Sequence, residues 1–129
     1  MGLKSRRIRV LVADDSRTAL RSFCRFLEVI EYFDIVGTAR DGVDMLAKVQ
    51  RLRPELVLTD LSMPRMSGLE ATAELKKIDH NLRVIIFTEL WGLSLREECF
   101  RSGADGFLEK GEIPEKLMPE VRRLFPTDS

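Results

Sequence analysis

Long apolar runs are absent from this chain of 129 residues. None approaches the roughly 18 residues that a membrane-spanning helix needs, and the cationic start, residues 1–9, lacks the apolar segment of a secretory signal. Neither sign of charge is in excess, because the chain carries 21 basic and 21 acidic side chains. No net field would therefore attract nucleic acid or an anionic membrane. These absences favour a soluble, cytoplasmic protein that binds neither a membrane nor nucleic acid directly.

Cysteine is scarce as well. Cys24 and Cys99 are the two cysteines, and their spacing fits neither a CxxC motif nor a set of metal ligands. We therefore expect two reduced packing residues and no disulfide.

The residues that are present suit one globular domain with a single core, since 44% are apolar and 33% are charged. Short apolar, β-branched segments predict strands at residues 8–13, 35–39, 56–59, 83–87 and 106–109. Helical patterns lie between them. Strict alternation of strand and helix predicts an α/β fold, in which a five-stranded parallel sheet is covered by helices on both faces.

Start signals support this division of the chain. Ser67 with Glu70 and Ser94 with Glu97 have the spacing of capping boxes, and Asp41 is a plausible helix N-cap. Pro119 lies inside the last helical pattern, where a proline removes one backbone hydrogen bond. We expect a loose turn over residues 112–118 and a firmer helix over 119–125.

Five polar residues lie within a residue or two of the predicted strand ends: Asp14, Asp15, Asp60, Thr88 and Lys110. The carboxyl ends of parallel strands meet at one edge of the sheet, where doubly wound folds bind their ligands. Each residue alone could be a helix cap, a turn cap, a strand residue or a solvated charge. Together, at four successive strand ends, they predict one site.

Three converging carboxylates repel one another unless a cation lies between them. Oxygen ligands favour Mg²⁺, with Mn²⁺ as an alternative, over Zn²⁺. Asp60 is the best candidate nucleophile for an aspartyl phosphate, Lys110 would offset the phosphoryl charge, and Thr88 supplies a hydroxyl.

Four segments resemble the receiver domain of two-component response regulators, a CheY-like superfamily: VLVADDS at 10–16, LVLTDLSMPRMSG at 56–68, VIIFTE at 84–89 and SGADGFLEKG at 102–111. The resemblance implies a doubly wound, flavodoxin-like (βα)5 fold with strand order 2-1-3-4-5. It also implies that residues 1–129 form a single receiver domain, with a core at about 8–125 and no output domain in this chain.

The resemblance also assigns roles at the site. It implies that Asp60 is the phosphoacceptor and that Asp15, Asp60 and the backbone carbonyl of Ser62 bind Mg²⁺. Asp14 would act mostly through a metal-bound water, and Lys110 would contact the acceptor and its phosphate. The phosphoryl donor would be a sensor histidine kinase or a histidine phosphotransfer protein.

A conformational switch is implied too, with Thr88 and Phe107 as the switch pair. In the family, the face corresponding here to residues of about 94–125 docks a downstream target or a second receiver. Trp91, near the edge of that face, fits partner contact or a partly buried loop equally well. His80 lies in a DHN sequence typical of a turn and is not expected to be the phosphodonor.

Two positions depart from the family pattern. Gly111 follows Lys110 where many receivers have a proline after a cis bond, so the geometry of the lysine must be held in another way. Glu89 follows Thr88 where a small residue is usual, and its carboxylate could repel an arriving phosphoryl group. We expect slower phosphotransfer than in a Glu89→Ala variant.

The chain is therefore expected to be no enzyme in the usual sense, but a phosphoacceptor that assists its own phosphorylation and dephosphorylation. It would act as a stand-alone receiver or as the receiver part of a longer regulator, including a transcriptional one, since the 19 residues 111–129 hold one helix at most. Two alternatives remain: a small Mg²⁺-dependent phosphatase with an aspartyl-phosphate intermediate, and a non-phosphorylated receiver-like interaction module.

Overall fold

The computed structural model describes residues 7–90 and 92–126, and Trp91 lies outside the described residues. Its elements, in chain order, are β1 (Ile8–Ala13), α1 (Arg17–Ile30), β2 (Phe33–Ala39), α2 (Gly42–Leu52), β3 (Leu56–Asp60), α3 (Gly68–Ile78), β4 (Arg83–Thr88), α4 (Leu93–Arg101), β5 (Gly106–Glu109), the 3₁₀ turn η1 (Lys110–Glu112) and α5 (Ile113–Leu124). In the described part of the chain, no helix is long and apolar enough to cross a membrane.

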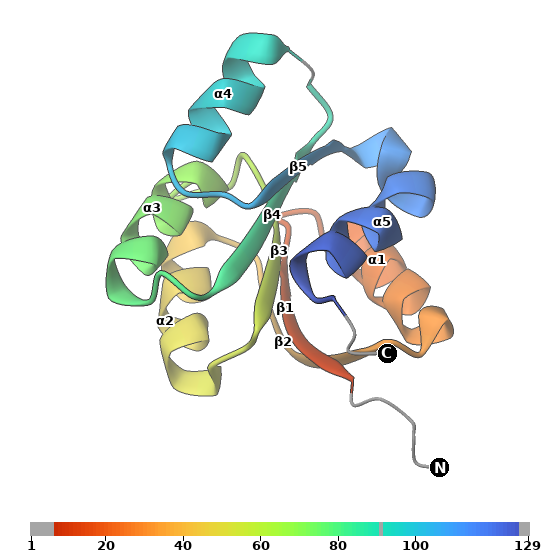
Figure 1. Ribbon diagram of the computed structural model, residues 1–129. Coiled ribbons are helices and arrows are strands. Elements are labelled where there is room, and N and C mark those ends of the chain that lie inside the picture. The colour runs from red at the N-terminus through yellow and green to blue at the C-terminus, as the bar shows by residue number, and fades with distance from the viewer. Residues whose placement is uncertain (1–6, 91, 127–129) are drawn as a thin grey trace.

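The strands form one parallel sheet in the order β2-β1-β3-β4-β5, which confirms the expected topology (Figure 1). The predicted strand boundaries hold to within two residues, the largest difference being that β2 begins at Phe33. The strand order reverses between β1 and β3, so the crevice at their carboxyl ends is the natural ligand position in this fold.

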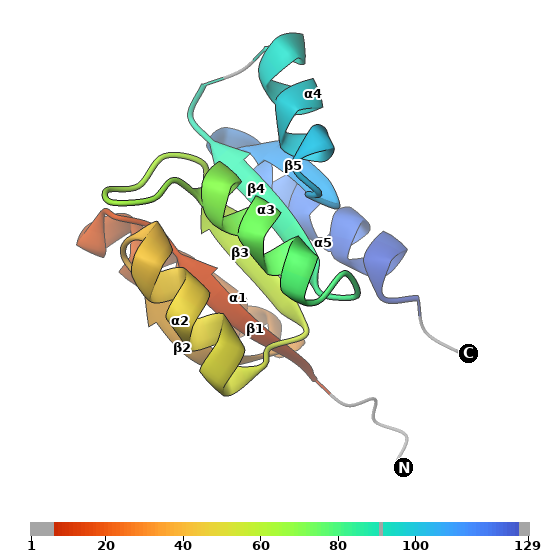
Figure 2. The same ribbon diagram turned by 90° about the vertical axis from the view of Figure 1, so that its left-hand side faces the viewer.

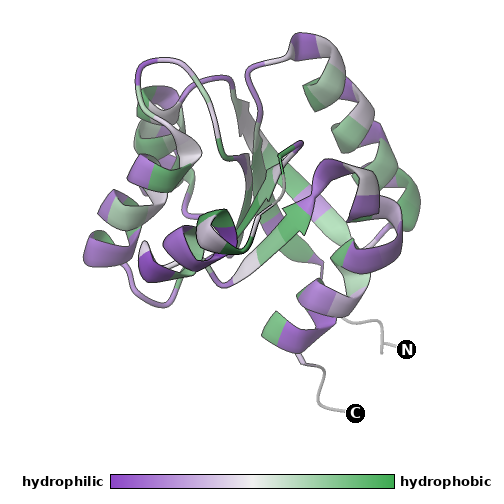
Figure 3. Cartoon of the chain, turned by 90° about the horizontal axis from the view of Figure 1, so that it is seen from above, coloured by the Kyte–Doolittle hydropathy of each residue, from purple (hydrophilic) through white to green (hydrophobic). Residues whose placement is uncertain are grey.

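Helices cover both faces of the sheet. Figures 1 and 2 show α1 and α5 on one face and α2, α3 and α4 on the other. Successive residues of β1 point to opposite layers: Val10 and Val12 join the core under α1 and α5, whereas Leu11 and Ala13 join the core under α2, α3 and α4. All four are fully buried, and Figure 3, seen from above, shows the apolar strands between partly polar helices.

The helix starts were predicted in part. The caps at Asp41 and at Ser67 with Glu70 are confirmed, since each side chain accepts from the backbone N–H three residues on. The box predicted at Ser94 is wrong, because α4 begins at Leu93 and its N-cap is Gly92, two residues before Ser94. A hydroxyl already inside the first turn cannot cap that turn.

The predicted loose turn over residues 112–118 is also wrong. Helix α5 runs without interruption from Ile113 to Leu124, with Pro119 inside it and Pro114 in its first turn. A proline inside a helix costs about 3 kcal/mol. Leu117 and Val121 are 1% and 0% exposed, and burying two such side chains offsets that cost at about 1.5–3 kcal/mol each.

Both cysteines are free, as predicted. Cys24 packs in the layer of α1 and Cys99 in the layer of α4, so the sheet separates them.

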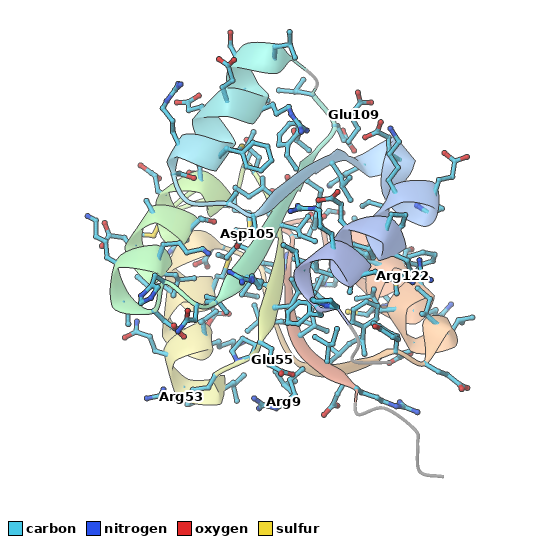
Figure 4. The ribbon with its side chains drawn as sticks, in the orientation of Figure 1. Arg9, Arg53, Glu55, Asp105, Glu109 and Arg122 are labelled. Atoms are coloured by element: carbon cyan, nitrogen blue, oxygen red, sulfur yellow. The ribbon has the colours of Figure 1, made fainter. Side chains whose placement is uncertain are left out.

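The amino end of the sheet is fixed by polar contacts. The Arg9 guanidinium donates to the carbonyl oxygens of Arg53 and Leu52, at 2.5 and 2.8 Å, and the Arg9 backbone N–H donates to Glu55 Oε1 at 2.9 Å. Figure 4 shows Arg9, Arg53 and Glu55 at this end, away from Glu109 at the other. Asp105 Oδ2 accepts from the Val84 N–H and from a lysine of α3, both at 2.8 Å. These contacts join β1 to the end of α2 and the segment after it, and join β4 and α3 to the residue before β5.

Candidate functional site

The polar residues predicted at the strand ends meet at the carboxyl edge of the sheet. Asp14 and Asp15 follow β1, Asp60 ends β3, Thr88 ends β4, and Lys110 is the first residue after β5. A carboxylate oxygen from each of the three aspartates lies within 4.8 Å of the other two. The parallel register of β1 and β3 causes this convergence, because it brings both strands to the same edge.

The acidic cluster is largely withdrawn from water. Asp14 is 1% exposed and Asp60 is 8% exposed, whereas Asp15 is exposed. Two of the three oxygens therefore belong to buried carboxylates, and oxygen donors of this kind suit a hard divalent cation such as Mg²⁺, which keeps several waters of its own. The donor set could hold such an ion.

Lys110 is the cation that the protein itself places in this cluster. Its Nζ lies 2.9 Å from Asp14 Oδ2 and 3.3 Å from Asp60 Oδ2, and 5.6 Å from the centroid of the Phe87 ring. Burial by itself would lower the pKa of Lys110, but the hydrogen bonds and charges of Asp14 and Asp60 outweigh burial and raise that pKa. The lysine is therefore charged at neutral pH, and Asp14 and Asp60 share it.

Asp60 is held in an unfavourable setting for a carboxylate. Burial is the largest influence and raises the pKa of Asp60; Lys110 lowers it, and the charge of Asp14 raises it again. The result is a pKa above the ordinary value. The Ser62 backbone N–H donates to Asp60 Oδ1 at 3.4 Å, a long bond that offsets little of the burial. A carboxylate in this setting is stabilised by any further cation.

The loop after β3 folds back and packs against the backbone of Asp60. A Cβ at Gly68 would lie 2.0 Å from the Asp60 carbonyl oxygen, so only glycine fits there, and the Gly68 N–H donates to the Leu61 carbonyl at 2.8 Å. Gly42, at the start of α2, is pressed in the same way against the Met66 carbonyl oxygen. The sequence reasoning missed both glycines, and their signal was a glycine directly after each N-cap.

Thr88 and Phe107 lie on neighbouring strands. Thr88 is 4% exposed, and its Oγ1 accepts from the Leu90 backbone N–H at 3.1 Å. Phe107 is 6% exposed and packs in the core under α2, α3 and α4, beside Ile86 of β4. In this structure the aromatic ring therefore already points inward, and the Thr88 hydroxyl is engaged with the loop after β4.

An apolar hollow opens beside the site, between α1 and α5. Phe23, Phe26, Phe87 and Ile113 line it, and Lys110 borders it. Phe23 packs edge to face against Phe87 with ring centroids 5.2 Å apart, so part of the wall of the hollow is a packed aromatic pair. A protein partner that reaches Asp60 from this side would find apolar surface next to the charged groups.

A doubly wound sheet of this strand order, with acidic residues and one lysine at its carboxyl edge, defines a CheY-like α/β receiver fold. Residues 10–122 match the family model described as the response regulator receiver domain, and the chain belongs to that family.

Curated relatives agree with this assignment. The response regulator GacA of Pseudomonas aeruginosa is 33% identical over 118 residues, covering 92% of this chain and 55% of GacA. Protein-glutamate methylesterase/protein-glutamine glutaminase 4 of Myxococcus xanthus is 38% identical over 128 residues, covering 97% of this chain and 36% of that protein. The chain thus spans between a third and about half of the length of these relatives.

Solved structures carry the same fold. A chain of the CheX–CheY–BeF3–Mg²⁺ complex from Borrelia burgdorferi superposes with a TM-score of 0.85 at 28% identity, covering 93% of this chain and 90% of that one. The response regulator domain of Thermotoga maritima CheB also gives 0.85, at 27% identity, covering 96% of this chain and all of that one. Receiver domains of this family serve two-component signalling and are generally not catalytic themselves, although some relatives carry methylesterase names.

Proposed function

We propose that this chain accepts a phosphoryl group on Asp60 from a sensor histidine kinase or a histidine phosphotransfer protein. One observation carries the proposal: the buried Asp60 carboxylate has an ammonium 3.3 Å away and lies in one cluster with the carboxylates of Asp14 and Asp15. A nucleophile, a fixed positive charge and a cation-binding set together match what phosphoryl transfer asks of a protein.

The transfer needs no general base. An Asp60 oxygen attacks phosphorus, the bond from phosphorus to the donor histidine nitrogen breaks, and that nitrogen keeps the electron pair and takes a proton. Lys110 compensates the charge that accumulates on the phosphoryl oxygens. Asp15, Asp60 and the carbonyl of Ser62 would hold Mg²⁺, with Asp14 acting through a water. When bound, Mg²⁺ neutralises charge on the acceptor and phosphoryl oxygens.

The apolar hollow between α1 and α5 supports a protein as the donor. It borders Lys110, and its wall of Phe23 and Phe26 offers contact area that a small phosphodonor would not use. The donor protein would cover this surface while it delivers its phosphohistidine to Asp60.

A phosphoryl group on Asp60 would also act on Thr88. The Thr88 hydroxyl would donate to a phosphoryl oxygen, and its movement would release the Leu90 N–H that it now accepts from. The loop after β4 and the buried Phe107 would then settle into a second arrangement. A downstream target or a second receiver would sense that change on the face formed by α4, β5 and α5.

Residues 1–129 would form one cytoplasmic receiver domain, with its core at about 8–125, that is not an enzyme in its own right. It would work alone or as the receiver part of a longer regulator.

Intact-mass measurement tests the proposal. Wild type incubated with Mg²⁺ and phosphoramidate should gain the mass of one phosphoryl group, and Asp60→Asn should gain none. Asp34→Asn is the matched control, because Asp34 is an exposed aspartate on β2, away from the site. Wild type without an adduct, or an adduct that persists in Asp60→Asn, would defeat the proposal. Steady release of phosphate from a phosphomonoester would instead indicate a phosphatase.

A further inference from the structure

The turn that carries Lys110 is poorly constrained by its own residues. Lys110 begins η1 and must reach back across the sheet edge to Asp14 and Asp60. The next residue is Gly111, which is exposed, and a Cβ built there would meet nothing within 4 Å. Glycine has the widest backbone freedom of any residue. The conformation of this turn must therefore be set by residues other than Gly111.

Glu112 supplies that constraint. Its Oε1 accepts from the Glu109 backbone N–H at 3.1 Å, and its Oε2 accepts from Lys116 Nζ at 3.1 Å. One carboxylate thus joins the last residue of β5, which Figure 4 labels, to the first turn of α5. The Glu109 hydrogen bond, followed by the one from Lys116, lowers the pKa of Glu112, so the carboxylate is ionised at neutral pH.

We infer that Glu112 is a positioning residue for the phosphoryl chemistry: its carboxylate bridges Glu109 and Lys116 and so fixes the turn that aims Lys110 at Asp60. The inference rests on the proposed function of Lys110. Glu112 does not touch Asp60 or the incoming group; it acts through Lys110. Its side chain is 31% exposed, and an exposed ion pair of this kind contributes little to folding, so its removal should leave the fold intact.

Kinetics with a small phosphodonor test the inference first. Glu112→Ala should take up the phosphoryl group from phosphoramidate about three- to tenfold more slowly than wild type, because small misplacement of a charge-stabilising group is costly. Glu112→Gln keeps an oxygen for the Glu109 N–H and should recover most of the rate. Glu115→Ala is the matched control, an exposed glutamate in the first turn of α5, and should leave the rate unchanged.

A double-mutant cycle separates positioning from a general loss of structure. Lys110→Ala should slow phosphorylation, and adding Glu112→Ala to that variant should slow it no further, because the group being positioned is already gone. If Glu112→Ala has the same proportional effect with and without Lys110, the inference is overturned.

A spectroscopic measurement decides the matter without phosphorylation. Lys110 Nζ lies 5.6 Å from the Phe87 ring centroid, so the lysine's terminal methylene protons should show a nuclear Overhauser contact with that ring. The contact should weaken in Glu112→Ala and persist in Glu112→Gln. A contact unchanged in Glu112→Ala overturns the inference even if wild type proves phosphorylatable. A wild type that takes up no phosphoryl group defeats the proposed function, and the contact still tests the role of Glu112.

Discussion

Replacing Asp60 by Asn should stabilise the protein when divalent cations are absent. With an effective dielectric constant of about 20, a carboxylate pair within 4.8 Å repels by about 3 kcal/mol or more, and a carboxylate 3.3 Å from an ammonium is attracted by about 5 kcal/mol. These effects oppose each other, and Lys110 keeps Asp14 as a partner in the variant. What remains is the cost of burying the Asp60 charge, the largest influence on its pKa. We expect a gain of about 1–2 kcal/mol in the free energy of unfolding at pH 7.

The pH dependence of this gain has a definite sign. The folded-state pKa of Asp60 is raised above its ordinary 3.8. In the pH window between 3.8 and that raised pKa, the folded state binds more protons than the unfolded state. The free energy of unfolding of the wild type therefore falls as the pH rises through the window, and the loss is complete above the raised pKa. The advantage of Asp60→Asn should be absent below about pH 3.8, grow as the pH rises, and be full above the raised pKa of Asp60.

Urea unfolding followed by circular dichroism, with a chelator present, measures both effects. At pH 7 the thermal midpoint of Asp60→Asn should also rise, by about 3–8 °C. Mg²⁺ should stabilise wild type, by about 2.7 kcal/mol at one hundred times its dissociation constant, and should stabilise Asp60→Asn less. Asp34→Asn serves as the control and should change little. An Asp60→Asn variant less stable than wild type at pH 7 without divalent ions would refute the reasoning.

Three further changes can be predicted from the structure. Glu89→Ala should speed phosphorylation by phosphoramidate about two- to fivefold, because repulsion from an exposed charge is worth about 0.5–1 kcal/mol. Added salt should reduce this effect. Glu97→Ala, at another exposed glutamate, is the control, and a wild type that is phosphorylated as fast or faster contradicts the prediction. Asp105→Ala should cost about 1–3 kcal/mol in urea unfolding, because it leaves a backbone N–H of β4 without its acceptor; an unchanged midpoint would count against that role. Burial, and to a smaller degree the negative charge of Glu98, raise the pKa of the Cys99 thiol to about 11. Iodoacetamide should therefore modify the partly exposed Cys24 first and Cys99 only on unfolding, which peptide mass mapping would show.

The sheet and the convergence of the acidic cluster could be predicted because both follow from local pattern. Apolar β-branched segments identify the strands, and parallel strands must present Asp14, Asp60 and Lys110 at one edge. The loop supports could not be predicted. The need for glycine at Gly68 arises from its contact with the Asp60 carbonyl, which forms only when the chain folds back on β3.

The errors have a physical cause as well. The spacing of Ser94 and Glu97 fits a capping box, but spacing alone does not tell which residue begins the helix. The prediction of a break before Pro119 left out the packing of α5, whose buried Leu117 and Val121 hold the helix against the sheet. Glu112 had a readable signal, a glutamate three residues after Glu109, but a glutamate is not among the usual helix caps.

The two ends of the sheet have opposite characters. At the amino end, Arg9, Glu55 and Asp105 are satisfied by well-matched partners, whereas at the carboxyl end Asp14 and Asp60 crowd around one lysine. Substitutions that stabilise the protein can thus be made at the amino end, where they leave the acidic cluster unchanged. Stability gained by neutralising Asp14 or Asp60 at the carboxyl end would instead remove groups that the proposed phosphoryl chemistry needs.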